Sequence, residues 1–449
     1  MLRALFVSII IVFGLVQSFR GPFYALLFYL WIAYFRPEFW LWSDFITQLN
    51  LSLIVGVFVL ISTVLWGPRL RFGVGPCLML LLLAQGLVST LMSPAFDYAW
   101  PYWQDFAKST IISCLIVTLV DSERALRLTF LVIAASLGLE AVKQGWVQLL
   151  LNPGAVNTND IVVLGDNNGV AVGMFMLFGI FVALARTAPG RTEKLSHRFA
   201  AVGVLYRGIS TFSRGGFLAC GALAIHFLLR SRQKFAAVIG ITAVVLLVVP
   251  IMSDAFWDRM RTIRTATDSI ETANESSEGR VHFWQVAIAM ANDRPLTGIG
   301  HNAYNALYNQ YDTSGGEYGT DRSVHSSWFG VLAELGYPGL LLFLLIIGNA
   351  LWTCRRTRRL AKQHPSLRNL GFYAFAIEGA LVTFAVGGSF VIFQYVEMLW
   401  HTLALSMVID RLVAERAAAL TAAPQTASRP EPVRARIGVA AATGRPVRV

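Results

Sequence analysis

Long apolar runs separated by short polar connections occupy most of the chain. A run of about 20 apolar residues can cross the hydrocarbon core of a bilayer as an α-helix. The last run is long enough for two tilted helices that meet at Gly387 and Gly388. The pattern predicts an all-α fold, a polytopic transmembrane helical bundle of about 12 spans. The runs cover residues 2–18, 22–35, 50–66, 74–92, 106–120, 127–150, 165–185, 197–213, 216–229, 234–251, 325–349 and 372–411.

The composition of the 449 residues supports a membrane protein. Hydrophobic residues make up 55% of the chain and charged residues 14%, whereas a soluble domain has roughly 45–50% and about 25%. The mean hydropathy is +0.58, an apolar excess that a water-soluble fold could not bury. A soluble enzyme, a disordered chain and a disulfide-rich scaffold are therefore excluded. The cysteines lack metal-ligand spacing and are predicted to be packing residues: Cys77, Cys114, Cys220 and Cys354.

The net charge of +11 comes from basic residues that gather in short loops between the apolar runs. This positive-inside pattern predicts that these loops are cytoplasmic, and it implies no nucleic-acid partner. No small-residue cleavage site follows the first run, so we expect it to remain as a first helix. The side of the membrane that holds Met1 stays open. The basic loops are residues 69–71, 124–127, 186–198, 230–234 and 355–368.

One long polar loop interrupts the apolar pattern and is predicted on the non-cytoplasmic face. It contains six arginines and no lysine. Helical spacing of apolar residues from Arg280 to Asn292 predicts a short interfacial helix, which Pro295 ends. The predicted regions are an N-terminal transmembrane bundle (1–251), this loop with its helices (252–324), C-terminal transmembrane helices (325–411) and a disordered basic cytoplasmic tail near anionic lipid (412–449).

Two arginines are predicted at the same membrane face as the polar loop. Arg214 lies in the segment Ser-Arg-Gly-Gly (213–216), where the glycines permit a tight reversal between two apolar runs. Arg207 lies seven residues earlier. If 197–213 is one helix, the two guanidinium groups lie on one face and could line one groove. Arginines that extend toward lipid headgroups are the alternative for both.

Predicted helix N-termini hold two further candidates, Arg280 and His325. Free N–H groups and the positive end of the helix dipole favour anions, so Arg280 in a first turn is a candidate phosphate site. His325 opens the run 325–349, where the dipole disfavours the protonated form and leaves the imidazole available as a general base. His301 and His282 are alternatives to it. A solvated arginine and structural histidines are the ordinary interpretations.

Charged and amide side chains within the apolar runs add two candidate sites. Glu140 and Lys143 are three residues apart on one predicted helix, and intramembrane charges are usually functional or mutually paired. Lys143 is therefore predicted either to pair with Glu140 or to contribute to a groove for an anionic substrate. Asp166, Asn167 and Asn168 open the next run and are predicted to cap it, with substrate binding by Asn168 as a second role.

Several catalytic motifs are absent from the sequence. It has no phosphate-binding loop for ATP, no nucleophile elbow, no Asp-x-Asp pair in the polar loop and no His/Cys metal cluster. These absences leave metal-independent chemistry on a lipid-embedded anion, and no cofactor is expected.

Three groups of residues resemble the O-antigen ligase family, in order and around the one long loop. The N-terminal part also resembles ligases associated with exosortase systems. The segments that carry the main resemblance are Ser210–Ala219, Gly279–Trp284 with Pro295–Gly300, and His325–Trp328 with Ala333–Gly339.

The resemblance implies a multi-pass glycosyltransferase of the bacterial inner membrane with its active site facing the periplasm. Such an enzyme moves a glycan from undecaprenyl diphosphate to the lipid A core without a metal. Carried over by position, Arg214 and Arg280 would bind the diphosphate, and His325 would act at the acceptor hydroxyl. Arg207, Lys143, His301 and Asn168 are the additional substrate-binding candidates; the resemblance assigns no role to Arg207.

Three other functions stay open. An O-antigen polymerase and a protein O-glycosylation ligase would use the same chemistry on other acceptors. A transporter or flippase would usually show two related halves, and no repeat relates residues 1–200 to 201–411.

Overall fold

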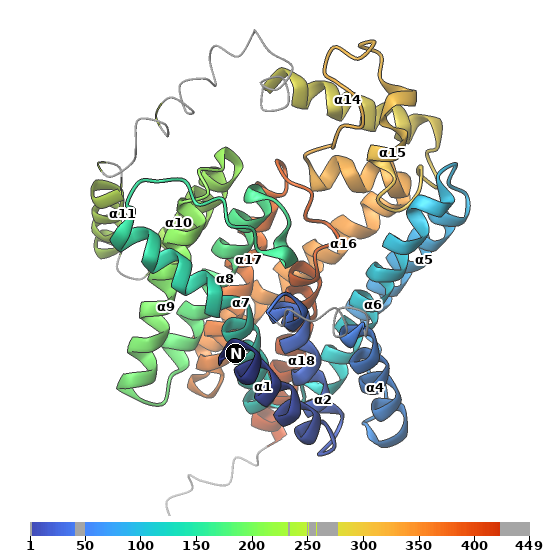
Figure 1. Cartoon of the computed structure of the whole chain (residues 1–449). Helices are drawn as coiled ribbons and strands as arrows, with labels where there is room; N and C mark the ends of the chain where they lie inside the picture. The colour runs from blue at the N-terminus through green and yellow to red at the C-terminus, as the bar shows by residue number, and fades with distance from the viewer. Residues whose placement is uncertain are drawn as a thin grey trace, which may run out of the picture.

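The computed structural model describes residues 2–40, 50–231, 234–248, 250, 257 and 277–422. Within these residues every regular element is a helix (Figure 1). The first half of the chain contains α1 (Leu2–Ser18), α2 (Pro22–Phe35), α4 (Leu51–Trp66), α5 (Val74–Leu91), α6 (Phe96–Leu119), α7 (Glu123–Leu151) and α8 (Asn167–Thr187). The second half contains α9 (Arg191–Ile209), α10 (Arg214–Arg230), α11 (Lys234–Val248), α14 (Ser277–Asp293), α15 (Tyr304–Tyr311), α16 (Ser327–Gln363), α17 (Arg368–Gly387) and α18 (Glu397–Ala422).

The core of the bundle is built around α8 and α17. Helix α8 is apolar on almost every side and packs against α9 and α17, while α17 also packs against α10 and α16. A helix that is apolar all round is expected in the interior of a helical protein. Trp400 of α18, which is fully buried, extends this core toward α6.

The predicted all-α fold is confirmed for the described residues. In the described part of the chain, five helices are long and apolar enough to cross a membrane: Val74–Leu91, Glu123–Leu151, Asn167–Thr187, Ser327–Gln363 and Pro365–Gly387. Shorter apolar helices cover Arg3–Ser18, Pro22–Phe35 and Leu51–Trp66. The count of about 12 spans stays a prediction, and most of residues 252–276 of the polar loop lie outside the described residues.

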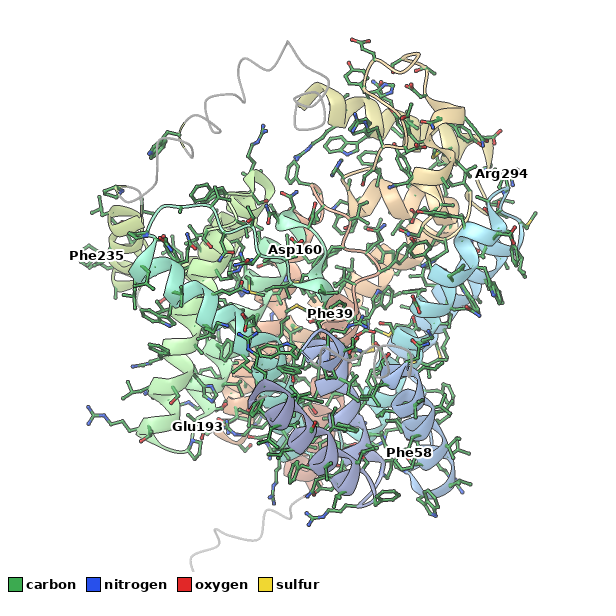
Figure 2. All side chains as sticks on the ribbon, in the orientation of Figure 1. Phe39, Phe58, Asp160, Glu193, Phe235 and Arg294 are labelled. Carbon is green, nitrogen blue, oxygen red and sulfur yellow. The ribbon has the colours of Figure 1, made fainter. Side chains whose placement is uncertain are left out.

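The bundle has two distinct ends. Helices α14 and α15 lie at one end (Figure 1), which we call the α14 end. Arg294, which follows α14, and Glu193, in the first turn of α9, lie at opposite ends of the molecule (Figure 2). The second end carries the basic residues 355–362 at the end of α16 and is called the basic end.

The last apolar run divides into two helices, as its glycines predict. Helix α17 ends at Gly387, and residues 388–396 connect it to α18; we call them the α17–α18 connection. Helix α18 then continues to Ala422, eleven residues beyond position 411, so the start of the predicted disordered tail is helical. Two ion pairs hold this extension: Arg416 bonds to Glu123 of α7, and Glu415 lies 2.9 Å from the guanidinium of Arg71. Residues 423–449 lie outside the described residues.

A buried carboxylate joins three helices near the basic end. Glu378 of α17 is 1% exposed and accepts from Arg230 of α10 at 3.0 Å, from Arg355 of α16 at 3.5 Å and from Arg358. Removing Glu378 leaves Arg358, whose side chain is 13% exposed, without its carboxylate partner. Breaking a buried ion pair in this way costs about 3–5 kcal/mol.

We therefore expect Glu378→Ala to lower the apparent melting temperature by several degrees in detergent, measured by differential scanning fluorimetry. Glu193→Ala is the matched control, because Glu193 also pairs with an arginine, Arg127, but its side chain is 34% exposed. Equal melting temperatures for the two variants would contradict the role of Glu378 in joining α10, α16 and α17.

Candidate functional site

The beginning of α16 differs from the prediction for His325. Ser326 is the N-cap, and its Oγ accepts from the backbone N–H of Phe329 at 3.5 Å. His325 precedes this cap with a backbone φ of 45°, so it does not lie in the first turn of the helix. The helix dipole therefore acts on it less directly than the sequence predicted.

The α17–α18 connection holds the beginning of α16 in place. Ser327 donates its backbone N–H to the carbonyl of Gly388 at 2.7 Å and its hydroxyl to the carbonyl of Val391 at 2.8 Å. The same hydroxyl accepts from the N–H of Phe393 at 2.9 Å. Because these bonds involve a fully buried serine, the position of the residues just before α16 is tightly fixed.

Phe390 of this connection lies between α10 and α14. The guanidinium carbon of Arg280, the fourth residue of α14, lies 5.7 Å from the centre of the Phe390 ring. On the other side, a Cβ built on Gly215 would lie 2.8 Å from the Cβ of Phe390, so only glycine permits this approach. Arg214 directly precedes Gly215 and is the first residue of α10. The side chain of Phe390 thus lies next to the N-terminal ends of both α10 and α14, which carry Arg214 and Arg280.

His325 belongs to the same region through α14. Its ring lies 6.2 Å, centre to centre, from that of Phe283, which is one helical turn beyond Arg280. The structure therefore brings Arg214, Arg280 and His325 to the α14 end, each at or near the N-terminal end of a helix. Three helix N-termini and two guanidinium groups make this region suitable for a multiply charged anion.

The N-terminus of α10 depends on Asn168. Ser213 caps α10 by accepting from the N–H of Gly216 at 2.9 Å, and its hydroxyl donates to Oδ1 of Asn168 at 2.6 Å. Asp166 caps α8 by accepting from the N–H of Gly169 at 2.9 Å, which confirms the predicted cap. The side chain of Asn168 thus contacts the residue just before Arg214 and fixes where α10 begins.

Arg207 does not share a helix with Arg214, so the predicted common helix face is wrong. Helix α9 ends at Ile209 and the chain turns before α10 begins. Arg207 is fully buried and donates to Oε1 of Gln144 at 2.7 Å and to the carbonyl of Asn159. Its contacts are with α7 and the segment that follows it.

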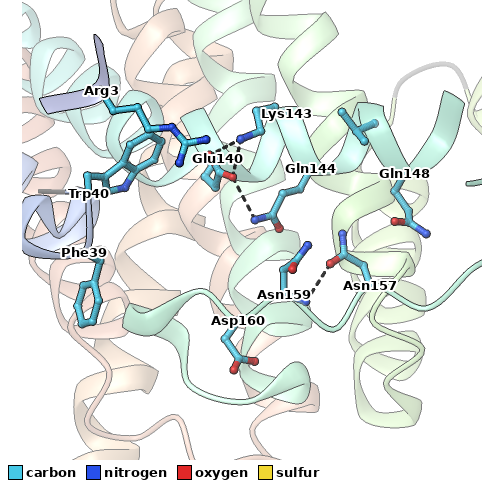
Figure 3. A pocket seen from close by; sticks show the side chains of 11 residues that line it. Arg3, Phe39, Trp40, Glu140, Lys143, Gln144, Gln148, Asn157, Asn159 and Asp160 are labelled. Carbon is cyan, nitrogen blue, oxygen red and sulfur yellow. Dashed lines mark hydrogen bonds and ion pairs between the residues drawn. The ribbon is translucent and has the colours of Figure 1, made fainter. Parts of the chain in front are cut away.

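The ion pair on α7 forms, which is one of the two roles predicted for Lys143. The ammonium of Lys143 lies 2.8 Å from Oε1 of Glu140. Both side chains line a cavity of about 500 Å³, shown in Figure 3. The structure therefore places Lys143 in an ion pair that also faces an open space.

His301 and His282 lie in packed environments. His301 is fully buried between the rings of Phe106 and Tyr395, and burial lowers the pKa of its imidazole to about 3. His282 bonds to Asp312 at 2.8 Å. Burial alone would raise the pKa of Asp312. Hydrogen bonds from Ser314, from the N–H of Gly316 and from His282 outweigh this effect and lower the pKa to about 2. Because the low pKa of His301 makes its imidazole a weak base, His301 is a poor alternative to His325.

Sequence reasoning missed Phe390 and the α17–α18 connection. The signal was present, because Gly387 and Gly388 interrupt the last apolar run. A break in a hydrophobic run shows that a helix ends, but it does not show which distant helices the connecting residues will contact.

Two family models match parts of the chain. Residues 199–344 match the family described as O-antigen ligase, which confirms the resemblance predicted from the sequence, and they include Arg214, Arg280 and His325. Residues 1–184 match a family of unknown function, DUF5935. No curated protein matches the chain.

Proposed function

Because residues 199–344 are a domain of the O-antigen ligase family, we propose that the chain is a metal-independent, inverting glycosyltransferase. It transfers a glycan from undecaprenyl diphosphate to the lipid A core in lipopolysaccharide biosynthesis. The observation that supports this most strongly is the grouping of Arg214, Arg280 and His325 around the α17–α18 connection.

The two arginines serve the leaving group in this proposal. When the bond between the anomeric carbon and the phosphate oxygen breaks, its electron pair stays on the diphosphate as negative charge. Guanidinium groups bind phosphate oxygens in pairs of hydrogen bonds and stabilise charge that develops in the transition state. Arg214 and Arg280 thereby perform the neutralisation that a metal ion supplies in other glycosyltransferases.

His325 serves the acceptor. A sugar hydroxyl is a weak nucleophile, and a neutral imidazole accepts its proton as the new carbon–oxygen bond forms on the opposite face of the anomeric carbon. The product is the inverted glycoside, the released carrier is undecaprenyl diphosphate, and the proton resides on His325 until solvent removes it.

The proposed setting is the inner membrane of a bacterium, with the α14 end in the periplasm and the basic end in the cytoplasm. The basic residues of loops 69–71, 124–127, 186–198 and 355–368 support this orientation through the positive-inside rule. About 12 spans are proposed, with residues 252–324 as the periplasmic loop between the two transmembrane regions.

The acceptor is tested by supplying three candidates in parallel to the purified protein with one carrier-linked glycan. Lipid A core, more carrier-linked glycan and an unfolded protein distinguish a ligase, a polymerase and a protein O-glycosylation ligase. We expect transfer to lipid A core. Longer carrier-linked chains or a glycosylated protein would reassign the acceptor, and no transfer to any of them would contradict the proposal.

The cap of α10 gives a further prediction. Ser213→Ala removes the bonds to Gly216 and Asn168, and loss of an N-cap costs about 1 kcal/mol of helix stability. We expect the initial transfer rate to fall several-fold because Arg214 is the next residue. Ser213→Thr keeps the hydroxyl and should retain most of the rate. Equal rates for alanine and threonine would show that this cap does not position Arg214.

A further inference from the structure

A polar stripe on α7 faces one side of a cavity. Glu140, Lys143, Gln144 and Gln148 follow one another at helical spacing on a helix that is otherwise apolar enough to cross a membrane. The segment 157–160 lies opposite them, and together they line the cavity of about 500 Å³ (Figure 3). This volume is within the range of small-molecule binding pockets.

The walls of the cavity are held in place by partly buried hydrogen bonds. Arg207, fully buried behind them, connects the two walls by bonding to Gln144 on one side and to the carbonyl of Asn159 on the other. Gln148 donates to the carbonyl of Ala155 at 2.8 Å and so holds the segment that leads to Asn159. The cavity therefore has a defined shape before any ligand enters, which lowers the entropic cost of binding.

The charged side chains that line the cavity balance one another. Arg3 and Lys143 are cationic, and Glu140 and Asp160 are anionic. A phosphate would be bound best where cations are in excess, as around Arg214 and Arg280. A cavity with equal numbers of both charges instead suits a neutral ligand that can both donate and accept hydrogen bonds.

The uncharged groups of the cavity have the same mixed character. The amide heads of Gln144, Asn157 and Asn159 point toward one another in Figure 3, and an amide presents two donors and one acceptor oxygen. Trp40 and Phe39 lie at one end of the cavity and supply apolar ring surface. Hydroxyl groups around a ring with an apolar C–H face would match this arrangement, and a sugar has that structure.

The cavity is connected to the region of Arg214. The backbone N–H of Asn157 donates to the carbonyl of Ser210, at the end of α9, at 2.8 Å. The same segment continues to Asp166 and Asn168, and Asn168 bonds to Ser213 beside Arg214. Residues 210–213, the corner between α9 and α10, are therefore hydrogen-bonded to the cavity segment at Asn157 and lie directly before Arg214.

We propose that this cavity binds a neutral sugar unit of one of the two glycolipid substrates, so that the sugar is held beside the corner that carries Arg214. The inference rests on the proposed function for the identity of those substrates. Lipid A core and the carrier-linked glycan are the two sources of such a sugar.

The test measures binding by the purified full-length protein in nanodiscs, with three probes: lipid A core, carrier-linked glycan and sugar-free undecaprenyl diphosphate. The variants are Asn159→Ala and Asn159→Ala with Asp160→Asn. Both side chains are exposed to the cavity, and the substitutions leave the carbonyl that bonds to Arg207. We therefore expect unchanged melting for Asn159→Ala. Asp160 also favours the charged form of the buried Arg207, so the double variant is compared only after its melting temperature has been measured. Asn152→Ala, an exposed amide at the end of α7 that does not line the cavity, is the matched control.

We expect the double variant to bind one of the two glycolipids at least tenfold more weakly, to bind the sugar-free carrier normally, and to show a KM raised by the same factor with kcat changed less than twofold. Unchanged affinity for both glycolipids, or an equal loss for the sugar-free carrier, would overturn the proposal. Binding that depends on Asn159 in a protein that transfers glycan to no acceptor would support the cavity while refuting the proposed reaction.

Discussion

Replacing His325 with alanine is expected to slow glycan transfer by about 10²–10⁴-fold, the usual contribution of a general base. The donor should still bind, because Arg214 and Arg280 are retained. The effect is measured as the initial rate of transfer to lipid A core by the purified protein at saturating donor. His364→Ala, at the end of α16 remote from the α14 end, is the matched control and should keep the wild-type rate.

The pH dependence separates two roles for this histidine. An imidazole that accepts a proton must be neutral, so the wild-type rate should fall in acidic buffer once His325 is protonated. A rate independent of pH between about 5 and 8 would mean that His325 only orients the hydroxyl. Full transfer by the His325→Ala variant would contradict both roles. Movement of glycolipid across the membrane that persists in His325→Ala would instead favour a transporter.

Replacing Arg280 with alanine is expected to lower kcat/KM for the carrier-linked donor by about 10²–10³-fold, as when one group that stabilises a developing negative charge is removed. Arg280→Lys keeps the charge but loses the paired hydrogen bonds, so it should recover only part of the rate. The measurement is the donor dependence of the initial rate at saturating lipid A core. Arg214→Ala should resemble Arg280→Ala.

Arg294→Ala provides the control on the same segment, because Arg294 follows α14 and bonds to the carbonyl of Met92 at 2.8 Å. It should leave the donor dependence unchanged. The double variant of Arg214 and Arg280 should lose less than the product of the two single losses, since both groups act on one diphosphate. Wild-type kcat/KM in Arg280→Ala would remove this arginine from the site.

Local features of the fold were predictable from the sequence because short-range chemistry determines them. Asp166 caps α8, Lys143 pairs with Glu140, and the glycines at 387 and 388 separate two helices, all as the residues alone indicate. The helix around Arg280 also forms, although it begins at Ser277 and not at Arg280. Capping, pairing at three-residue spacing and helix termination each depend on neighbours in the sequence.

The corner between α9 and α10 was not predictable from its apolar pattern. Residues 197–213 read as one run, but Ser210 and Thr211 turn their hydroxyls back onto the carbonyls of Arg207 and Gly208, at 3.0 and 2.8 Å. Phe212, three residues after the end of α9, adopts a left-handed backbone with φ of 52°, so the chain turns before α10 begins. Arg207 consequently lies in the core, while Arg214 begins a new helix.

The grouping of the candidate site depends on long-range packing that the sequence does not encode locally. Phe390 contacts both Gly215 and Arg280, although these residues lie on helices far apart in the chain. Ser327 is held by the carbonyls of Gly388 and Val391 across more than sixty residues of sequence. The sequence could name the arginines and the histidine, but only the fold shows that one connection lies among their helices.

The most direct test of the proposed reaction is a reconstituted transfer assay with purified protein, undecaprenyl diphosphate-linked glycan and lipid A core in the presence of EDTA. Wild type and His325→Ala are compared at equal protein. We predict that the wild-type protein transfers glycan in EDTA at its full rate and that transfer is lost in the variant. A wild-type rate that EDTA abolishes and added divalent cation restores would contradict catalysis by Arg214, Arg280 and His325 without a metal.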